Sequence, residues 1–201
     1  MLVRRTREQG DTIIEVLFAF TIFSLIAVAG LSLMNQGVAT AQRSLEIGLV
    51  RQQIDSQADA LRYLNRAFIA EYGHDGESTK LWKQVVFDNK VEVAQDYNAM
   101  IENKQCVVPS NAFAIDVNNM EDRPVLVPTN DTATYARINY DYPTGSRAEG
   151  IWVQAVRSVV PDDTVNRPGF YDFHIRACWH APGQVLPITI GTIVRLYEPR
   201  G

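Results

Sequence analysis

The chain has 201 residues, of which 46% are hydrophobic and 21% are charged, and its formal charge at pH 7 is −4. This composition excludes collagen-like, low-complexity and wholly disordered chains, and the small negative charge argues against a broad surface for nucleic acid. Residues 16–34 contain no charged side chain and would span about 28 Å as a helix, close to the hydrocarbon thickness of a bilayer. A freely soluble cytoplasmic enzyme is therefore not expected, and the remaining roughly 160 residues suffice for one domain with its own core.

The segment before this apolar run is basic. Residues 1–10, MLVRRTREQG, contain three arginines and one glutamate, and the positive-inside rule keeps such a segment in the cytoplasm while the rest is exported. A secretory signal peptide would have a shorter apolar region and a small-residue cleavage site. Residues 27–29 (Ala-Val-Ala) are a candidate for that site, but the apolar pattern continues to Met34. A plain signal anchor explains the length of the run but not Glu15, a carboxylate at its edge.

A third interpretation accounts for Glu15. Residues 10–19 read GDTIIEVLFA, which closely resembles the cleavage motif of type IV prepilins and type II secretion pseudopilins. In that family a basic leader ends in glycine and is followed by an apolar helix with a glutamate at its fifth position. The resemblance implies that a prepilin peptidase cleaves after Gly10 and N-methylates the new first residue, Asp11. The family most often has phenylalanine there, so Asp11 is a departure that bears on methylation more than on cleavage.

One long helix is predicted from Thr12 to about Tyr72, because no proline occurs before Pro109 and Gly73 is suited to a helix C-cap. Beyond the membrane segment, steps of three and four residues predict a single buried stripe on this helix. The stripe consists of Val50, Ile54, Ala58, Leu61, Leu64 and Phe68.

After the long helix, a short second helix is predicted at residues 78–87, and from there the apolar period changes to two. Strands are predicted around residues 113–117, 151–155, 171–179 and 188–196, with turn-forming residues between them. The predicted fold class is α+β, a long N-terminal helix packed on an antiparallel β-sheet of about four strands. The resemblance implies this same pilin fold.

Candidate sites in the exported part are few. Cys106 and Cys178 are expected to form a disulfide in an oxidising compartment, with two buried free thiols as the alternative. No metal site is expected, since neither cysteine has CxxC spacing and the chain has three histidines. A Cys178–His180 nucleophile site is disfavoured because no acylation motif surrounds it. The acidic clusters near residues 118–122, 130–131 and 162–163 are interpreted as solvated turns rather than calcium sites, and no cofactor is expected.

These patterns together predict a leader at residues 1–10, a transmembrane and filament-core helix at 11–42, and an exported head at 43–201 whose first part, 43–72, is the distal half of the helix. The resemblance implies a non-enzymatic subunit of a type IV pilus or a related secretion or competence pseudopilus, with a minor pilin or J-type pseudopilin favoured. Its implied partners are the prepilin peptidase, other pilin subunits through Glu15, and an inner-membrane assembly platform. Binding of nucleic acid is not supported. The alternative is a signal-anchored extracellular binding or enzymatic domain whose N-terminus mimics the motif.

Overall fold

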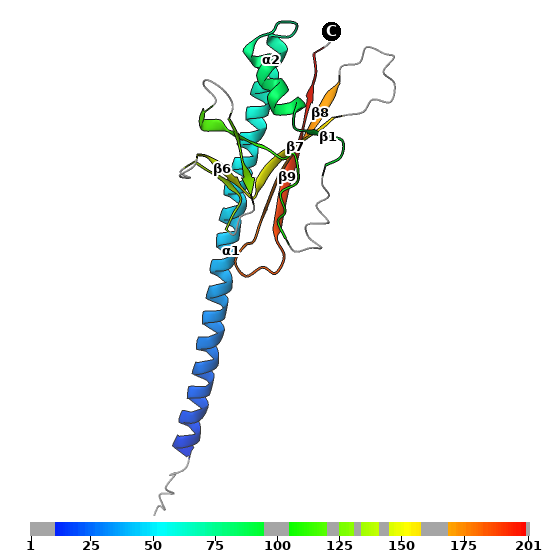
Figure 1. Ribbon diagram of the computed structural model, residues 1–201. Coiled ribbons are helices and arrows are strands. Elements are labelled where there is room, and N and C mark those ends of the chain that lie inside the picture. Colours follow the sequence, from blue (N-terminus) through cyan, green and yellow to red (C-terminus); the bar gives the residue numbers. More distant parts are fainter. Residues whose placement is uncertain are drawn as a thin grey trace, which may run out of the picture. The chain divides into compact units, whose positions relative to one another are not determined.

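The computed structural model describes residues 11–94, 105–119, 125–130, 134–140, 145–157 and 169–199 (Figure 1). Contacts between residues divide the chain into two compact units, Met1–Ser44 and Leu45–Gly201. The first unit contains the N-terminal part of helix α1 (Asp11–Ala70), and the second contains its C-terminal part together with the described strands.

Helix α1 confirms the predicted long helix and ends two residues earlier than expected. The chain leaves the helix through a turn in which Gly73 has a φ of 85°, the left-handed conformation that glycine adopts without strain. A second helix, α2 (Glu77–Trp82), continues directly into a π-helical turn, η1 (Lys83–Phe87), so the helix predicted at residues 78–87 is present but is not α-helical throughout.

The described strands form three sheets. The largest has the order β1-β7-β8-β9, a second pairs β2 with β3, and a third has the order β4-β6-β5. A 3₁₀ turn, η2 (Val117–Asn119), follows β2. The strands are β1 (Lys90–Val91), β2 (Ala114–Asp116), β3 (Val125–Val127), β4 (Thr129–Asn130), β5 (Arg137–Asn139), β6 (Arg147–Glu149), β7 (Ile151–Arg157), β8 (Phe170–Trp179) and β9 (Ile188–Tyr197).

The predicted antiparallel sheet is present in part: β7, β8 and β9 pair antiparallel, as do β2 and β3, but the large sheet and the β4-β6-β5 sheet are mixed. Strand β1 runs parallel to β7, pairing Lys90 with Ala155, and β4 runs parallel to β6. Parallel neighbours need a crossover connection in place of a hairpin, and between β1 and β7 the chain passes through the two smaller sheets. Alternation of apolar residues predicts a strand but carries no information about the direction of its neighbour, so the sequence pattern could not reveal this pairing.

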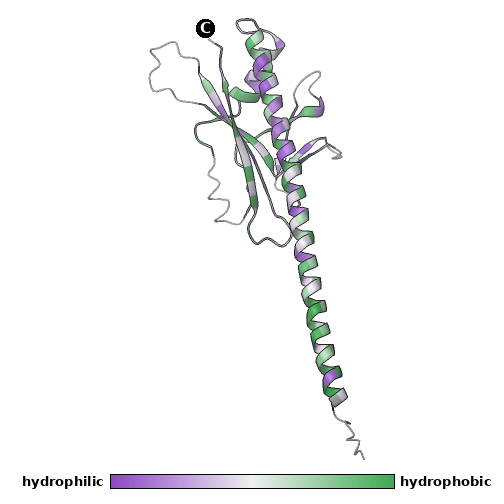
Figure 2. Cartoon of the chain, turned by 180° about the vertical axis from the view of Figure 1, so that it is seen from behind, coloured by the Kyte–Doolittle hydropathy of each residue, from purple (hydrophilic) through white to green (hydrophobic). Residues whose placement is uncertain are grey.

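The core of the second unit lies between the C-terminal part of α1, α2 and the inner face of the large sheet. Every member of the predicted α1 stripe is buried. Figure 2 shows hydrophilic and hydrophobic residues alternating along this part of the helix. On β8, Tyr171, Phe173 and Ile175 are completely buried, as the period-two pattern predicts. Phe68 of α1 stacks on Trp82 of α2 with ring centroids 5.3 Å apart, which ties the two helices together above the sheet.

A buried amide connects α1 to the short sheet formed by β2 and β3. Gln57 is fully buried; its Nε2 donates to the carbonyl of Ile115 at 2.7 Å, and its Oε1 accepts from the Ile115 amide at 2.8 Å. The side chain therefore pairs with the backbone of β2 as a neighbouring strand would. Both Ile115 groups are buried, so they have no access to water if the Gln57 amide is removed.

Replacing Gln57 with leucine should lower the free energy of unfolding by about 3 kcal/mol, because two buried backbone groups lose their partners while the volume is nearly kept. Unfolding by urea can be followed by tryptophan fluorescence, since Trp82, Trp152 and Trp179 are all fully buried in the second unit. The matched control is Gln52→Leu on the exposed side of the same helix, which should change stability by less than about 0.5 kcal/mol. Equal losses in the two variants would contradict the role assigned to Gln57.

Candidate functional site: an exposed apolar helix

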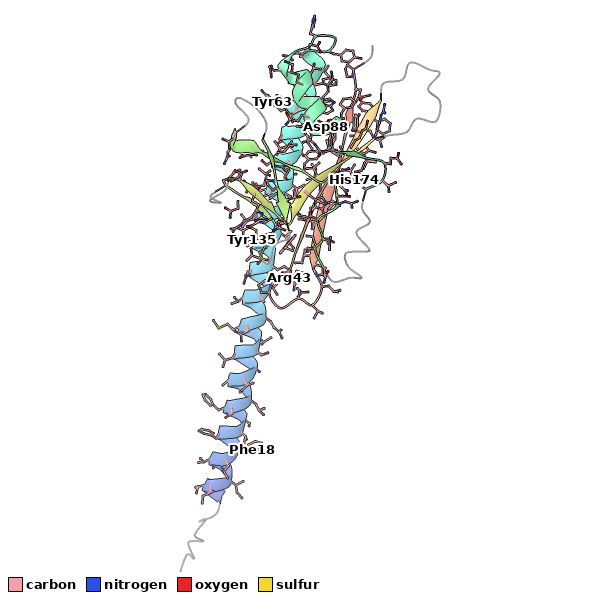
Figure 3. All side chains as sticks on the ribbon, in the orientation of Figure 1. Phe18, Arg43, Tyr63, Asp88, Tyr135 and His174 are labelled. Atoms are coloured by element: carbon pink, nitrogen blue, oxygen red, sulfur yellow. A yellow bond between two sulfur atoms is a disulfide. The ribbon has the colours of Figure 1, made fainter. Side chains whose placement is uncertain are left out.

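The first unit presents apolar side chains on all sides of a helix. From Ile13 to Val38 the large hydrophobic residues are exposed, for example Phe18 at 67% and Phe20 at 70%. Figure 2 shows this part of α1 as mostly hydrophobic, with paler turns and a hydrophilic band near its start, and Figure 3 shows Phe18 on it. Among the described residues, α1 is the one helix that is long and apolar enough to cross a membrane. Such a surface is unstable in water and requires hydrocarbon or other apolar helices around it.

Three hydroxyl groups in this segment are satisfied by the helix itself. Thr21 Oγ1 donates to the Phe18 carbonyl and Ser24 Oγ to the Phe20 carbonyl, both at 2.8 Å, and Thr40 Oγ1 donates to the Gln36 carbonyl at 2.9 Å. An unpaired hydroxyl would cost free energy in an apolar environment, whereas these bonds need no water. These three positions are therefore suited to an apolar environment although their side chains are polar.

The residues of the predicted cleavage motif lie at the start of this helix. Asp11 is the first helical residue, and Glu15 follows one turn later as an exposed side chain. Gly10 lies outside the described residues. Between Glu15 and Arg43 the helix has no other ionisable side chain, so Glu15 is an isolated charge within an apolar surface.

The structure joins Cys106 and Cys178 in a disulfide, which confirms the predicted pairing. The bond attaches the segment around Cys106 to the outer face of β8, where Trp152 is completely buried against the two cysteines, Val108 and Ala112. Because its sulfur is bonded to Cys106, Cys178 has no thiolate for a nucleophile site with His180. On the same face, burial and, to a lesser degree, Arg176 lower the pKa of His174 below its ordinary value.

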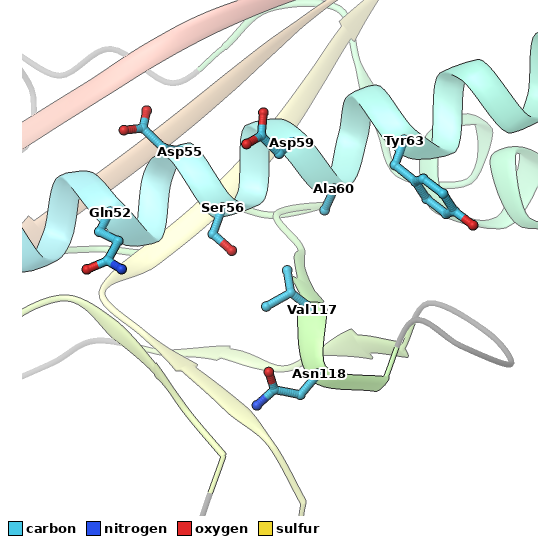
Figure 4. Close-up of a pocket in the computed structure, with 8 residues that line it drawn as sticks. All are labelled: Gln52, Asp55, Ser56, Asp59, Ala60, Tyr63, Val117 and Asn118. Atoms are coloured by element: carbon cyan, nitrogen blue, oxygen red, sulfur yellow. The ribbon is translucent and has the colours of Figure 1, made fainter.

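An open pocket of about 730 Å³ lies along the polar side of α1 in the second unit (Figure 4). Its walls come from α1 residues between Gln52 and Tyr63 and from Val117 and Asn118 of η2. Two carboxylates line it: Asp59 is paired with Arg62 at 2.7 Å, and Asp55 lies one turn earlier on the helix. The pocket contains no histidine or cysteine, and its polar groups form no arrangement of nucleophile and base.

One acidic residue near the predicted turn at 118–122, Asp116, is buried, and both of its carboxylate oxygens accept hydrogen bonds. Asp116 accepts hydrogen bonds from the Asn118 amide, Asn119 Nδ2 and Ser146 Oγ, so its carboxylate organises the turn. Within the described parts of the chain, no group of three or more His, Cys, Asp or Glu side chains is placed to hold a metal ion. The acidic clusters at residues 120–122, 131 and 162–163 lie outside the described residues.

Comparison of the chain with models of known protein families, with curated proteins and with solved structures finds no match. The sequence motif and the chemistry of the two units are therefore the features that indicate a function.

Removal of the disulfide should destabilise the second unit. The bond closes a loop with a sequence separation of 72 residues, and the chain-entropy model gives a stabilisation of about 4 kcal/mol for a loop of that size. The double variant Cys106→Ala, Cys178→Ala should therefore unfold at lower urea concentration, measured by the fluorescence of the three buried tryptophans, of which Trp152 packs against the two cysteines. Adding a thiol reductant to the native protein should reproduce the shift, and reductant should have no effect on the double variant. An unchanged midpoint would show that the bond contributes no stability.

Proposed function

We propose that the chain is a structural, non-catalytic subunit of a type IV pilus or of a related type II secretion or competence pseudopilus, and that within such a filament it is a minor pilin or J-type pseudopilin. In this proposal it enters the cytoplasmic membrane with its N-terminus inside and its head outside. A prepilin peptidase cleaves it after Gly10, and an inner-membrane platform assembles it with other subunits into a cell-surface filament. The exposed apolar surface of residues 13–38 is the observation that carries the proposal.

Two features favour a subunit that assembles into a filament over a domain that is only anchored in the membrane. The first is the order of basic leader, Gly10, helix start at Asp11 and Glu15, which resembles the prepilin motif, with Asp11 in place of phenylalanine and Ile13 in place of leucine. The second is the continuation of the same helix into a segment that buries one stripe against a sheet, so one element carries both the apolar surface and the attachment of the head. A signal-anchored domain needs the apolar segment but does not need the motif.

Glu15 has a specific role in this proposal. An acidic side chain near mid-bilayer costs about 2.5–3.5 kcal/mol on insertion scales, and less near the interface. Cleavage after Gly10 would create an α-amino group on Asp11, a cation that also has to leave water when the helices pack together. Pairing that amine with Glu15 of a neighbouring subunit neutralises both charges and sets the axial offset between adjacent helices. The carboxylate of Asp11 competes for the same amine and would weaken this pair. Asp11 in place of the usual phenylalanine therefore affects both N-methylation and the strength of the pairing with Glu15.

The first test is the mature N-terminus. Mass spectrometry of protein purified from membranes of the native host should find Asp11 as the first residue, because glycine at the membrane surface is the residue that the peptidase accepts. Gly10→Leu should abolish this cleavage, while the conservative change Gln9→Ala, one residue earlier, should not. A mature protein that still begins at Met1, or one that begins beyond Ala29, would favour a signal-anchored or secreted domain instead.

The second test is filament incorporation. Glu15→Val should leave membrane insertion and cleavage unchanged but reduce the share of mature protein found in sheared filaments by at least tenfold, since loss of one member of a buried ion pair typically costs about 3–5 kcal/mol. Ser24→Val is the matched control, a polar-to-apolar change in the same helix at a hydroxyl that bonds only within the helix. It should incorporate like the native chain. Equal incorporation of Glu15→Val and the native protein would exclude the pairing mechanism.

A further inference from the structure

Strand β9 forms one edge of the large sheet. In the order β1-β7-β8-β9 it has β8 as its partner on one side, and its ten residues are all paired with β8 in antiparallel register, from Phe170 opposite Tyr197 to Trp179 opposite Ile188. A ten-residue edge is long compared with β1 at the other side of the same sheet, which has two residues. Strand β9 is therefore the longest edge strand of the described sheets, and no other described strand pairs with its outer side.

The register shows which backbone groups face outward. The Glu198 amide donates to the Gly169 carbonyl at 2.8 Å, and residues on an antiparallel strand alternate between bonding the partner and facing away from it. Even-numbered residues of β9 thus bond β8, and Thr189, Gly191, Ile193 and Arg195 direct their amides and carbonyls away from the sheet. Tyr197 fits this alternation, since its carbonyl faces out and accepts a bond from Asn65 Nδ2 at 3.2 Å.

This edge lacks the features that usually protect one. Proline flanks β9 at positions 187 and 199 but does not occur within it, and Gly191 is exposed at its middle. The charged residue of the strand, Arg195, turns back over the sheet: its guanidinium binds both oxygens of Asp172 at 2.8 Å and lies 4.1 Å from the centre of the Phe170 ring. A charge held in this way does not repel an approaching strand, and natural sheets usually use a free lysine, a proline or a bulge for that purpose.

Beside the edge lies a groove of about 330 Å³, within the second unit. It is bounded by Arg51, Ile54 and Asp55 of α1 on one side and by Ile190, Gly191 and Thr192 of β9 on the other. Ile190 and Thr192 belong to the face of β9 that is turned towards α1, so the inward-facing side chains of a strand added next to β9 would enter this groove. Aliphatic side chains would there contact Ile54 and Ile190 while Arg51 and Asp55 remain at the rim.

We propose that the edge of β9 binds an extended segment of a partner protein as a fifth strand of the sheet. Backbone donors and acceptors spaced two residues apart are matched by an extended polypeptide, and the groove selects small aliphatic side chains at alternate positions. A second copy of this chain does not fit as well, because the inward-facing side chains of its own β9 already pack beneath its own α1. The occupant is therefore a segment that is not already part of a sheet. The proposal uses residues of the second unit alone and does not depend on the filament assignment.

The test uses the full chain in lipid nanodiscs and a fluorescent synthetic peptide of alternating threonine and valine with a lysine at each end. The control peptide has the same sequence, with N-methyl groups on every amide that would face β9. The unmodified peptide should bind, measured by anisotropy, and should slow hydrogen exchange in residues 188–197 at least tenfold. The methylated peptide should bind at least tenfold more weakly, because it retains the side chains but loses the donors.

Two variants locate the binding edge. Ile193→Pro removes an outward amide at an edge position where proline is tolerated and should weaken binding at least tenfold. Ile193→Thr keeps the backbone at this exposed position and should change binding less than threefold, and tryptophan fluorescence checks that both variants are folded. Absence of binding, equal binding of both peptides, or protection confined to other strands would overturn the proposal. Concentration-dependent dimerisation without peptide that protects residues 188–197 would also overturn it, by assigning the edge to a second copy.

Discussion

The attachment of α1 to the sheet is the constraint on which the second unit depends. An apolar stripe alone would let the helix slide by a turn along the sheet with little cost, because one aliphatic contact resembles another. Directional polar contacts remove this freedom: Gln57 binds both backbone groups of Ile115, Asn65 binds the Tyr197 carbonyl, and Glu46 accepts a hydrogen bond from Trp179 at 3.1 Å. The bonds of Gln57 and Glu46 are buried and that of Asn65 is partly buried. A shift of one turn would break all three, so hydrogen bonds fix the register of the helix and apolar burial supplies its stability.

The two faces of the large sheet are covered by different means. The inner face packs against α1 and α2, where burial of aromatic side chains such as Phe173 supplies the stability. The outer face has no helix over it in the described residues, and near Trp152 it is covered by a segment held by the Cys106–Cys178 bond. A disulfide suits this position because the segment has few apolar side chains of its own with which to stay in place. The segment held by the disulfide covers only the part of the outer face near Trp152. Towards β9 the outer face is exposed to solvent, and the Ile193 side chain there is 59% exposed.

Sequence patterns predicted the elements with strong periodicity and missed those specified by distant partners. The long helix, its stripe and the buried face of β8 follow from local spacing, and the disulfide was predicted from two cysteines in a part expected to be exported. Gln57 stands three residues after Ile54 and four before Leu61, so it has the spacing of the stripe. An amide at such a position signals a buried polar contact, but spacing alone does not identify a partner 58 residues away. The parallel pairing of β1 and the edge position of β9 depend on strand order, which local patterns do not encode.

Two surfaces have no partner among the described residues, the apolar helix of the first unit and the edge of β9, and they require different kinds of surroundings. The apolar helix of the first unit is satisfied by any hydrocarbon surroundings, since the hydrophobic effect depends on area and not on direction. Lipid and neighbouring apolar helices are equivalent partners in this respect, and in the proposed function Glu15 is the group that distinguishes between them. The edge of β9 instead requires donors and acceptors at fixed spacing, which lipid cannot supply and an extended polypeptide can. A chain with both surfaces can therefore be retained at a membrane without selectivity and still recognise one kind of partner, because the two requirements are met by different residues in different units.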